Sequence, residues 1–440
     1  MKASDSIHAA WVTTRNQILS CIPQAYRDDA SVLNTLYTWF LIGILMRVLV
    51  MPFAFHGDIL STYHRSYLLA SEGCLQYLNP HETIQAAFLI PFSYITPAYE
   101  YIVWSGSTTV LADFWVSILD STHIFRTIFL FKTPYLLFDI LICITLLYIF
   151  KNEKEKGLRA FIFWCVNPVV IFAVYIFGRF EVIPLFFILA AIYYIKEDNI
   201  PIASLLLGIA LVDRMYIILF VPFFFIFCCP AITDKIKAVL ITFTPLLIYN
   251  IITKVTTDAL SSLELAESMF LNYLLGLQVD IGTVQSVYAF VIGYGCIFLF
   301  AHYMRKNDNP LLDFITYSLL VLLLLYTVSV FHPHYFIWFI PFLALYYGYI
   351  QDSMIMELHC LQIILFTFST FYYGPELAAW LFASIHPVIL TAVSSPAQFI
   401  DQFFQVRIIL NTARSLFSAV TLFMIARIFM NMMRGHHHER

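Results

Sequence analysis

Charge is what this 440-residue chain has least of. Only 12% of its residues are charged, whereas 61% are hydrophobic, and the hydrophobic ones include 43 Phe and 27 Tyr. A soluble domain has about 25% charged residues and about 45–50% apolar residues, and a disordered chain has few aromatic residues. Both classes are therefore excluded. The composition predicts a polytopic membrane protein.

Other familiar features are missing as well. The eight cysteines show no CxxC or Cys/His metal spacing, so we expect no disulfide framework, no metal and no cofactor. A net charge of −4 offers no basic face for phosphates, which argues against a nucleic-acid partner. The first residues have no apolar core or small-residue cleavage site, so no cleaved signal peptide is expected. No P-loop, HExxH or nucleophile elbow is present.

Long apolar runs are abundant, and a membrane span needs about 20 such residues. We expect one transmembrane unit over residues 34–430, between a cytoplasmic segment 1–33 and a cytoplasmic tail 431–440. The candidate spans are 34–55, 127–150, 160–177, 182–196, 236–253, 283–304, 311–331, 335–350, 354–373 and 404–430.

Residues 201–229 are too long for one span and carry Asp213 and Arg214 in their middle. With a turn at 212–214, the basic residues collect in the inside loops, and the outside segments 254–282 and 371–401 keep one lysine, as the positive-inside rule requires. We therefore predict two half-helices here and both termini in the cytoplasm. The basic residues placed inside are Lys151, Lys154, Lys156, Arg159, Lys196, Lys235, Lys237, Arg305, Lys306, Arg427, Arg434 and Arg440.

The largest segment between spans, 56–126, is predicted to lie outside. Its stretches His56–Tyr77 and Leu111–Phe125 alternate apolar and polar residues in a way that suits helices lying on the membrane interface. The predicted fold is thus all-α, with about 12 membrane helices and short interfacial helices in the first outer loop. No repeat of fixed period is present, which argues against an inverted-repeat transporter.

Ionisable residues at membrane depth are functional by default, and a few lie at the predicted outer face. Asp58 directly follows the first span, where it serves either a site or the N-cap of a helix. Arg179 and Glu181 flank a tight turn and form either a local salt bridge or part of a site. Arg47, inside the first span, is expected either to reach the outer interface or to pair with an acidic residue of a neighbouring helix.

Two further motifs carry polar groups at this face. Asp213 and Arg214 form either an internal ion pair or a phosphate site, because a guanidinium binds phosphate with two parallel hydrogen bonds. In the sequence FHPHY, His332, His334 and Tyr335 form either an aromatic-belt turn or donors to phosphate and sugar hydroxyls.

Four stretches carry a resemblance to a known family: RVLVMPFAFHGD (47–58), NPVVIFAVYIFGRFEVIP (167–184), LGIALVDR (207–214) and HPHYFIWFIP (332–341). Together they resemble the GT-C glycosyltransferases that use polyprenyl-phosphate sugars, and most closely the branch with the first mannosyltransferase of GPI-anchor synthesis and its prokaryotic relatives. Two positions depart from the family, which often has Asp where Glu181 stands and Lys where Asp213 and Arg214 stand.

The resemblance implies an inverting hexosyltransferase, with mannose as the expected sugar. Its donor is a polyprenyl-phosphate-linked sugar, and its acceptor is a lipid, glycan or protein. Asp58 occupies the place of the catalytic base. Arg179, Arg214, His332 and His334 are expected to bind the donor phosphate. His56, Arg65, Glu181 and Tyr335 are expected to contact substrate.

Two alternatives share these features. One is a transporter or flippase of a lipid-linked or small polar solute, and the other is a non-catalytic subunit of a glycosylation complex. For all three we expect an integral multi-pass protein, placed in the plasma membrane of a prokaryote rather than in the endoplasmic reticulum.

Overall fold

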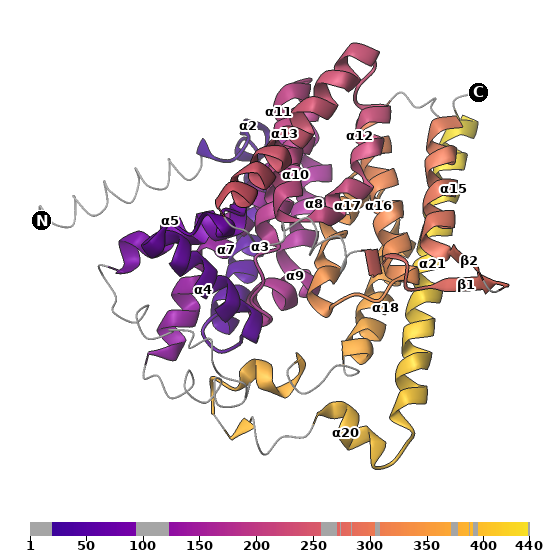
Figure 1. Ribbon diagram of the computed structural model, residues 1–440. Coiled ribbons are helices and arrows are strands. Elements are labelled where there is room, and N and C mark those ends of the chain that lie inside the picture. Colours follow the sequence, from indigo (N-terminus) through magenta and orange to yellow (C-terminus); the bar gives the residue numbers. More distant parts are fainter. Residues whose placement is uncertain are drawn as a thin grey trace, which may run out of the picture.

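The structure is a computed structural model that describes residues 20–93, 123–256, 271–272, 274–282, 284–303, 309–370, 377–386, 388–389 and 395–438. It is a helical bundle with one small hairpin among these residues (Figure 1). The longer helices are α3 (Ala30–Val50), α4 (Gly57–Glu72), α7 (Ile124–Ile149), α13 (Ile232–Thr256), α16 (Pro310–Val328), α18 (Ser353–Thr370) and α21 (Val406–His438).

Shorter elements lie between these helices. They are α2 (Gln24–Arg27), η1 (Leu75–Tyr77), α5 (Pro80–Ser93), α8 (Lys154–Val166), α9 (Pro168–Val170), the π-helical turn η3 (Ile171–Ile176), α10 (Val182–Lys196), α11 (Ile200–Asp213), η4 (Met215–Leu219), α12 (Val221–Phe227), β1 (Gln278–Ile281), β2 (Gln285–Tyr288), α15 (Ala289–Tyr303), η5 (Pro333–Ile337), α17 (Ile340–Ile350), η7 (Ala379–Phe382) and α20 (Pro396–Asp401).

Five helices are long and apolar enough to cross a membrane, namely α3, α7, α13, α16 and α21, and α8 with α9 and η3 makes a sixth if this bent pair is one span. On α3, Leu41, Leu45 and Leu49 are 58–64% exposed, a stripe that suits contact with lipid. The chain is therefore an all-α membrane protein. The predicted total of about 12 membrane helices is not confirmed, because several apolar helices of the described regions have only 10–17 residues.

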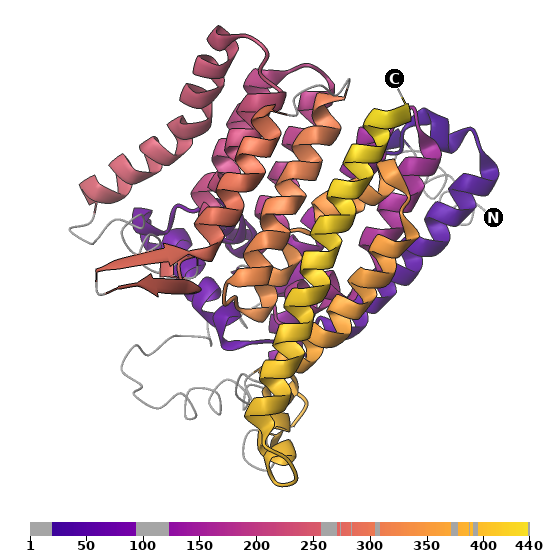
Figure 2. The same cartoon turned by 90° about the vertical axis from the view of Figure 1, so that its right-hand side faces the viewer.

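Two element boundaries differ from the sequence prediction. The hairpin of β1 and β2 projects from the side of the bundle (Figure 2), so the span expected from residue 283 begins at Ala289. Helix α21 continues to His438, through most of the segment predicted as a tail. The first stretch expected to form an interfacial helix does hold a helix, α4, whereas the second, at 111–125, lies almost wholly outside the described residues.

Two of the basic loops predicted on one side, between α7 and α8 and between α10 and α11, do meet at one end of the bundle. Lys151 Nζ lies 2.7 Å from Glu197 Oε1, Lys154 is paired with Asp29, and Lys196 Nζ donates to the Ile149 carbonyl at 2.5 Å. We call this the lysine-rich end. Helix α3 starts here and has 21 residues, so the chain that follows it, including Asp58, lies about 30 Å away at the opposite end.

The break predicted in residues 201–229 is confirmed. Helix α11 ends at Asp213, Arg214 has an extended backbone, and η4 and α12 continue in a new direction. Helix α12 returns toward the lysine-rich end, where α13 begins (Figure 1). Short helices at membrane depth are tolerated where protein buries them, and Asp213 and Tyr216 are both buried.

Two buried cations fasten α7 to its neighbours. The Arg47 guanidinium of α3 pairs with Asp139 of α7 at 2.6 Å, which is one of the two roles that the sequence left open for it. Trp164 and Tyr175 donate to the same carboxylate at 2.6 and 2.7 Å. About two turns nearer the start of α7, the side-chain nitrogen of Lys132 donates to three main-chain carbonyls, including those of Met51 and Tyr175. These bonds hold the end of α3 beside η3.

The Arg47–Asp139 pair gives a test of the bundle. Arg47→Leu should lower the free energy of unfolding by about 3–5 kcal/mol, because it leaves the Asp139 charge buried without its partner. Arg47→Leu combined with Asp139→Leu should recover part of this loss. Unfolding of the detergent-solubilised protein by added denaturing detergent measures the effect.

The matched control is Lys154→Ala, which removes the partly exposed pair with Asp29 and should change the free energy of unfolding far less than Arg47→Leu does, because solvent screens such a pair. Equal destabilisation by Arg47→Leu and Lys154→Ala would contradict a supporting role of the buried pair.

Candidate functional site

Four turns of the chain meet at the end of the bundle opposite the lysine-rich end. They are the start of α4, the loop between η3 and α10, the break between α11 and η4, and the turn before η5. The backbone joins two of them directly, because His56 N donates to the Phe177 carbonyl at 2.9 Å. The polar residues brought together here are Asp58, Arg179, Glu181, Arg214, His332 and His334, and we call them the polar site.

Asp58 lies in the first turn of α4, but it is not the N-cap. That role belongs to His56, whose Nδ1 accepts a hydrogen bond from Asp58 N at 3.2 Å. The Asp58 carboxylate is thereby left for other partners, and its Oδ2 lies 3.3 Å from Arg179 Nη1. With 38% of its side chain exposed, Asp58 is reachable by a substrate.

The Asp58 carboxylate is held in its charged form. Burial alone would raise its pKa, but the adjacent His56 ring and the charge of Arg179 lower the pKa below the usual range of a carboxyl. The positive end of the α4 dipole acts in the same direction. Asp58 is therefore ionised at neutral pH and accepts hydrogen bonds.

The second acidic residue of the site, Glu181, is completely buried at the start of α10. Both of its oxygens are engaged by the Arg214 guanidinium, with Nε at 3.1 Å from Oε2 and Nη2 on Oε1. Trp338 Nε1 also donates to Oε2, at 2.9 Å. These bonds orient Arg214, and the burial of Glu181 is at odds with the expected direct contact between Glu181 and substrate.

Neither of the local ion pairs weighed from the sequence is formed. Arg179 pairs with Asp58 and not with Glu181, two residues away, and Asp213 pairs with His81 of α5 and not with Arg214. The turn at Gly178 makes the first of these possible, because its φ of +90° suits glycine and an added Cβ would lie 2.9 Å from Ile59 Cδ1.

Aromatic rings separate and orient the charges. The Phe180 ring is contacted by both arginines, with the guanidinium carbon of Arg214 at 4.2 Å and that of Arg179 at 4.8 Å from its centroid. Trp338 stacks between Tyr216 at 3.8 Å and Tyr335 at 4.3 Å. The two guanidiniums are thus fixed on a rigid surface, as cation–π contacts of this kind provide.

His332 and His334 lie together, with their Nδ1 atoms 2.7 Å apart. Burial lowers the pKa of His332 to about 4 and also lowers the pKa of His334, so both rings are neutral at pH 7. Each neutral ring carries one N–H, and one of these is used between the two Nδ1 atoms. Only the other ring therefore keeps an Nε2–H that can donate to a phosphate, and neither ring adds charge before it binds. Among the described residues, no group of three or more His, Cys, Asp or Glu is arranged to hold a metal ion.

Arg65 lies apart from the polar site. Its Nε is 2.5 Å from Glu82 Oε1, so α4 and α5 are joined by this pair, and the expected substrate contact of Arg65 has no support in the geometry. Sequence reasoning missed Glu82, His81 and Trp338. It also passed over Lys132 and Asp139, although an ionisable residue inside a predicted span was a signal that could have found both.

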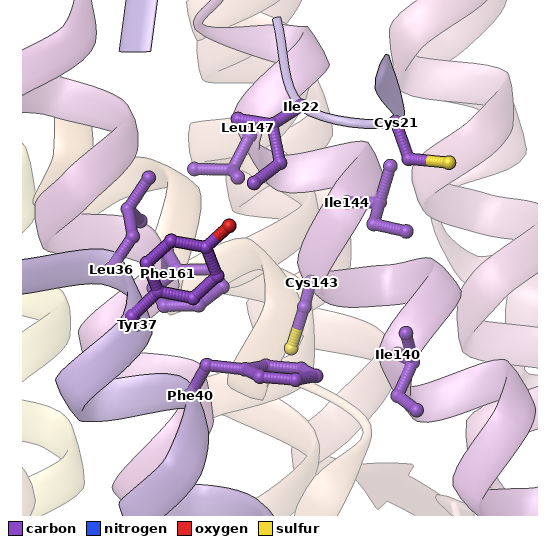
Figure 3. A pocket seen from close by; sticks show the side chains of 10 residues that line it. All are labelled: Cys21, Ile22, Leu36, Tyr37, Phe40, Ile140, Cys143, Ile144, Leu147 and Phe161. Carbon is purple, nitrogen blue, oxygen red and sulfur yellow. The ribbon is translucent and has the colours of Figure 1, made fainter. Parts of the chain in front are cut away.

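An apolar cavity lies elsewhere in the bundle (Figure 3). It is a cavity of about 270 Å³ between α3, α7 and α8, toward the lysine-rich end, and its lining includes Phe40, Cys143, Leu147 and Phe161. Because no charged side chain lines it, this cavity does not suit a sugar phosphate, and the polar site remains the candidate for chemistry.

Comparison of the chain with protein-family models, curated proteins and solved structures found no match. The geometry of the polar site and the sequence resemblance therefore carry the functional argument.

The partly buried His332 ring predicts how stability depends on pH. An unfolded histidine binds a proton at a pKa of about 6.5, whereas folded His332 does so at about 4. The unfolded chain therefore binds more protons between these values, and Tm should fall as the pH is lowered from 7 to 4. His332→Gln should make this fall shallower, as measured by thermal unfolding in detergent.

The control for this experiment is His302→Gln, at an exposed position on α15. It should leave the slope of Tm against pH as it is in the unaltered protein. Identical slopes for His332→Gln and the unaltered protein would show that the His332 ring is not held neutral.

Proposed function

We propose that this protein is a membrane glycosyltransferase that moves a hexose from a polyprenyl-phosphate donor to an acceptor hydroxyl. The observation that carries the proposal is the Asp58 carboxylate, which is ionised, partly exposed and placed beside Arg179. A second guanidinium, that of Arg214, lies against the same Phe180 ring. A general base next to cations for a phosphate is what such a transfer requires.

The two arginines supply the binding site for the donor phosphate. Arg214 uses Nε and Nη2 for Glu181, which leaves Nη1 for a phosphate oxygen. Arg179 Nε is buried without a hydrogen-bond partner in the described structure. Both guanidiniums are fixed by Phe180, so little side-chain freedom is lost when they bind an anion.

The reaction follows as a single displacement. The acceptor oxygen attacks the anomeric carbon while Asp58 takes the hydroxyl proton, and the bond from this carbon to the phosphate oxygen breaks. The leaving polyprenyl phosphate keeps the electron pair, and Arg179 and Arg214 stabilise its charge. One displacement inverts the configuration at the anomeric carbon.

Arg179 links donor binding to the strength of the base. In the structure it lowers the pKa of Asp58, which makes this carboxylate a weak base. A bound phosphate competes for the same guanidinium and shields Asp58 from its charge. The basicity of Asp58 therefore rises when the donor is in place.

The remaining expected contacts fit around this centre. Of His332 and His334, the ring whose Nδ1 accepts their shared hydrogen bond can donate from Nε2 to a phosphate oxygen. His56 and Tyr335 border the site through the Phe177 and Trp338 rings. The acceptor is a lipid, glycan or protein, and mannose is the sugar to test first. We place the site on the outer face of a prokaryotic plasma membrane, with both termini in the cytoplasm.

A transporter or flippase is the competing proposal. The polar residues gather at one end of the bundle, opposite the paired lysines, and a carboxylate is held ionised among them. A transported solute needs a site that opens to both sides in turn, usually near the midplane. The arrangement therefore favours transfer at one face.

Asp58→Asn tests the base directly. It should lower the rate of sugar transfer by about 100-fold or more, because the amide cannot take the acceptor proton. The assay follows release of polyprenyl phosphate from polyprenyl-phosphate mannose, and from the corresponding glucose and galactose donors, by the purified protein with a lipid extract as acceptor.

The matched control is Asp280→Asn, at an exposed carboxylate of the hairpin that accepts a hydrogen bond from Ser286 Oγ. It should keep the activity of the unaltered protein, and both variants should keep its Tm. Turnover by Asp58→Asn equal to that of the control would remove Asp58 from the mechanism.

Arg214→Lys tests the phosphate site. Lysine keeps the charge but not the two-pronged geometry, so kcat/KM for the donor should fall by about tenfold to 100-fold. Arg159→Lys, at a guanidinium that donates to the Gly348 carbonyl near the lysine-rich end, is the control and should leave kcat/KM unchanged. An Arg214→Lys variant as active as this control would argue against phosphate binding by Arg214.

A further inference from the structure

A second buried cluster of charged residues lies beside the polar site and has no role in the mechanism above. It consists of Arg65, His81, Glu82 and Asp213, which come from α4, α5 and the end of α11. His81, Glu82 and Asp213 are each no more than 7% exposed. Removing charged side chains from water costs free energy unless they are paired. A buried charged cluster outside the polar site therefore suggests a function of its own.

Asp213 binds the start of α5 at two points. Its Oδ1 accepts a hydrogen bond from His81 N at 3.2 Å and is also bonded by His81 Nδ1. The main-chain N–H groups at the start of a helix have no partners within the helix, and the helix dipole favours a negative charge there. Asp213 therefore acts as an N-terminal cap for α5, supplied from a distant part of the chain.

His81 carries this connection to the two arginines. Its ring is stacked on Phe180 with 3.4 Å between centroids and 2° between the planes. The same Phe180 ring is contacted by the guanidiniums of Arg179 and Arg214. The position of α5 is thus transmitted through one aromatic ring to both cations of the polar site.

The chain itself adds a second connection. Arg214 directly follows Asp213. At this break in the helix, Asp213 therefore contacts His81 of α5, and the next residue, Arg214, pairs with Glu181. Helix α5 is also packed on α4, which begins with Asp58, and the Arg65–Glu82 pair joins these two helices. The His81–Asp213 pair is therefore connected to the helix of the base through α5 and α4, and to Arg214 through the backbone.

We propose that His81 and Asp213 are a positioning pair, which fastens α5 to the break after α11 and thereby holds Arg179 and Arg214 toward the donor phosphate. This inference rests on the proposed function. Neither residue contacts substrate, and both act through Phe180 and the backbone of Arg214.

The charge balance of the cluster supports this role. Burial would lower the pKa of His81, but Asp213 and Glu82 hold it above its usual value, which favours the ring that donates from Nδ1. Glu82 in turn is bound by Arg65 and by Asn79 Nδ2, the latter at 2.6 Å. Two acidic and two basic residues therefore neutralise one another without any ligand.

The test uses kinetics of the full-length protein in detergent with polyprenyl-phosphate mannose as donor. His81→Phe keeps the stack on Phe180 but loses the bond to Asp213, and Asp213→Asn loses the charge. Each should raise the KM for the donor or lower kcat so that kcat/KM falls by about tenfold or more, since a displaced binding group weakens catalysis. The double variant should be no worse than either single variant, because both remove one interaction.

His81→Asn is the conservative variant, because its amide can donate to Asp213 from near the position of Nδ1. It should restore most of the lost kcat/KM. His302→Asn, on the exposed side of α15, controls for the loss of a histidine. If a variant loses more Tm than His81→Asn does, its activity is compared after correction for folding. For such a variant we measure how tightly the fraction that stays folded binds farnesyl phosphate, a short polyprenyl phosphate.

The outcomes separate the two proposals. If the unaltered protein releases polyprenyl phosphate in an Asp58-dependent way but His81→Phe and Asp213→Asn match His302→Asn, the positioning pair is overturned and the function stands. If the unaltered protein neither releases nor binds polyprenyl phosphate, the proposed function fails, and the positioning pair fails with it. A loss in both single variants, with rescue by His81→Asn, supports the pair.

Discussion

The Glu181 carboxylate lies completely buried where the start of α10 meets the break after α11 and the turn after α16. An isolated charge in such a place would be strongly unfavourable. Here it is balanced by two bonds from Arg214 and one from Trp338. Because these bonds need Arg214 to point inward, the break in the helix, the orientation of Phe180 and the geometry around Asp58 all depend on this one interaction.

Broken helices are what allow so many polar groups to meet. A continuous helix satisfies its own backbone and presents side chains only along its sides, whereas a helix end leaves main-chain groups and flanking residues for other partners. The start of α4, the turn at Gly178 and the break at Arg214 all bring such ends to one place. The apolar spans around them act as a rigid frame, fastened by Arg47 and Lys132.

The ion pairs of the site join distant parts of the chain. Arg179 reaches Asp58 and Arg214 reaches Glu181, although each arginine has an acidic neighbour within two residues. At a tight turn, adjacent side chains point in different directions, so sequence proximity does not favour contact. Long-range pairs also connect helices, and in a protein with few charges each such pair fixes the relative position of two elements.

Composition and charge pattern alone determined that this chain is a helical membrane protein, that the basic loops after α7 and α10 share one end, and that residues 201–229 break at Asp213 and Arg214. These are properties of single segments in an apolar solvent, which hydropathy and the placement of lysine report directly. The partners of each charge, the capping of α4 by His56 and of α5 by Asp213, the number of full spans and the hairpin at 278–288 were decided by tertiary structure. These features depend on which helix ends meet in three dimensions. Hydropathy and charge pattern describe each segment separately, so they do not predict which ends meet.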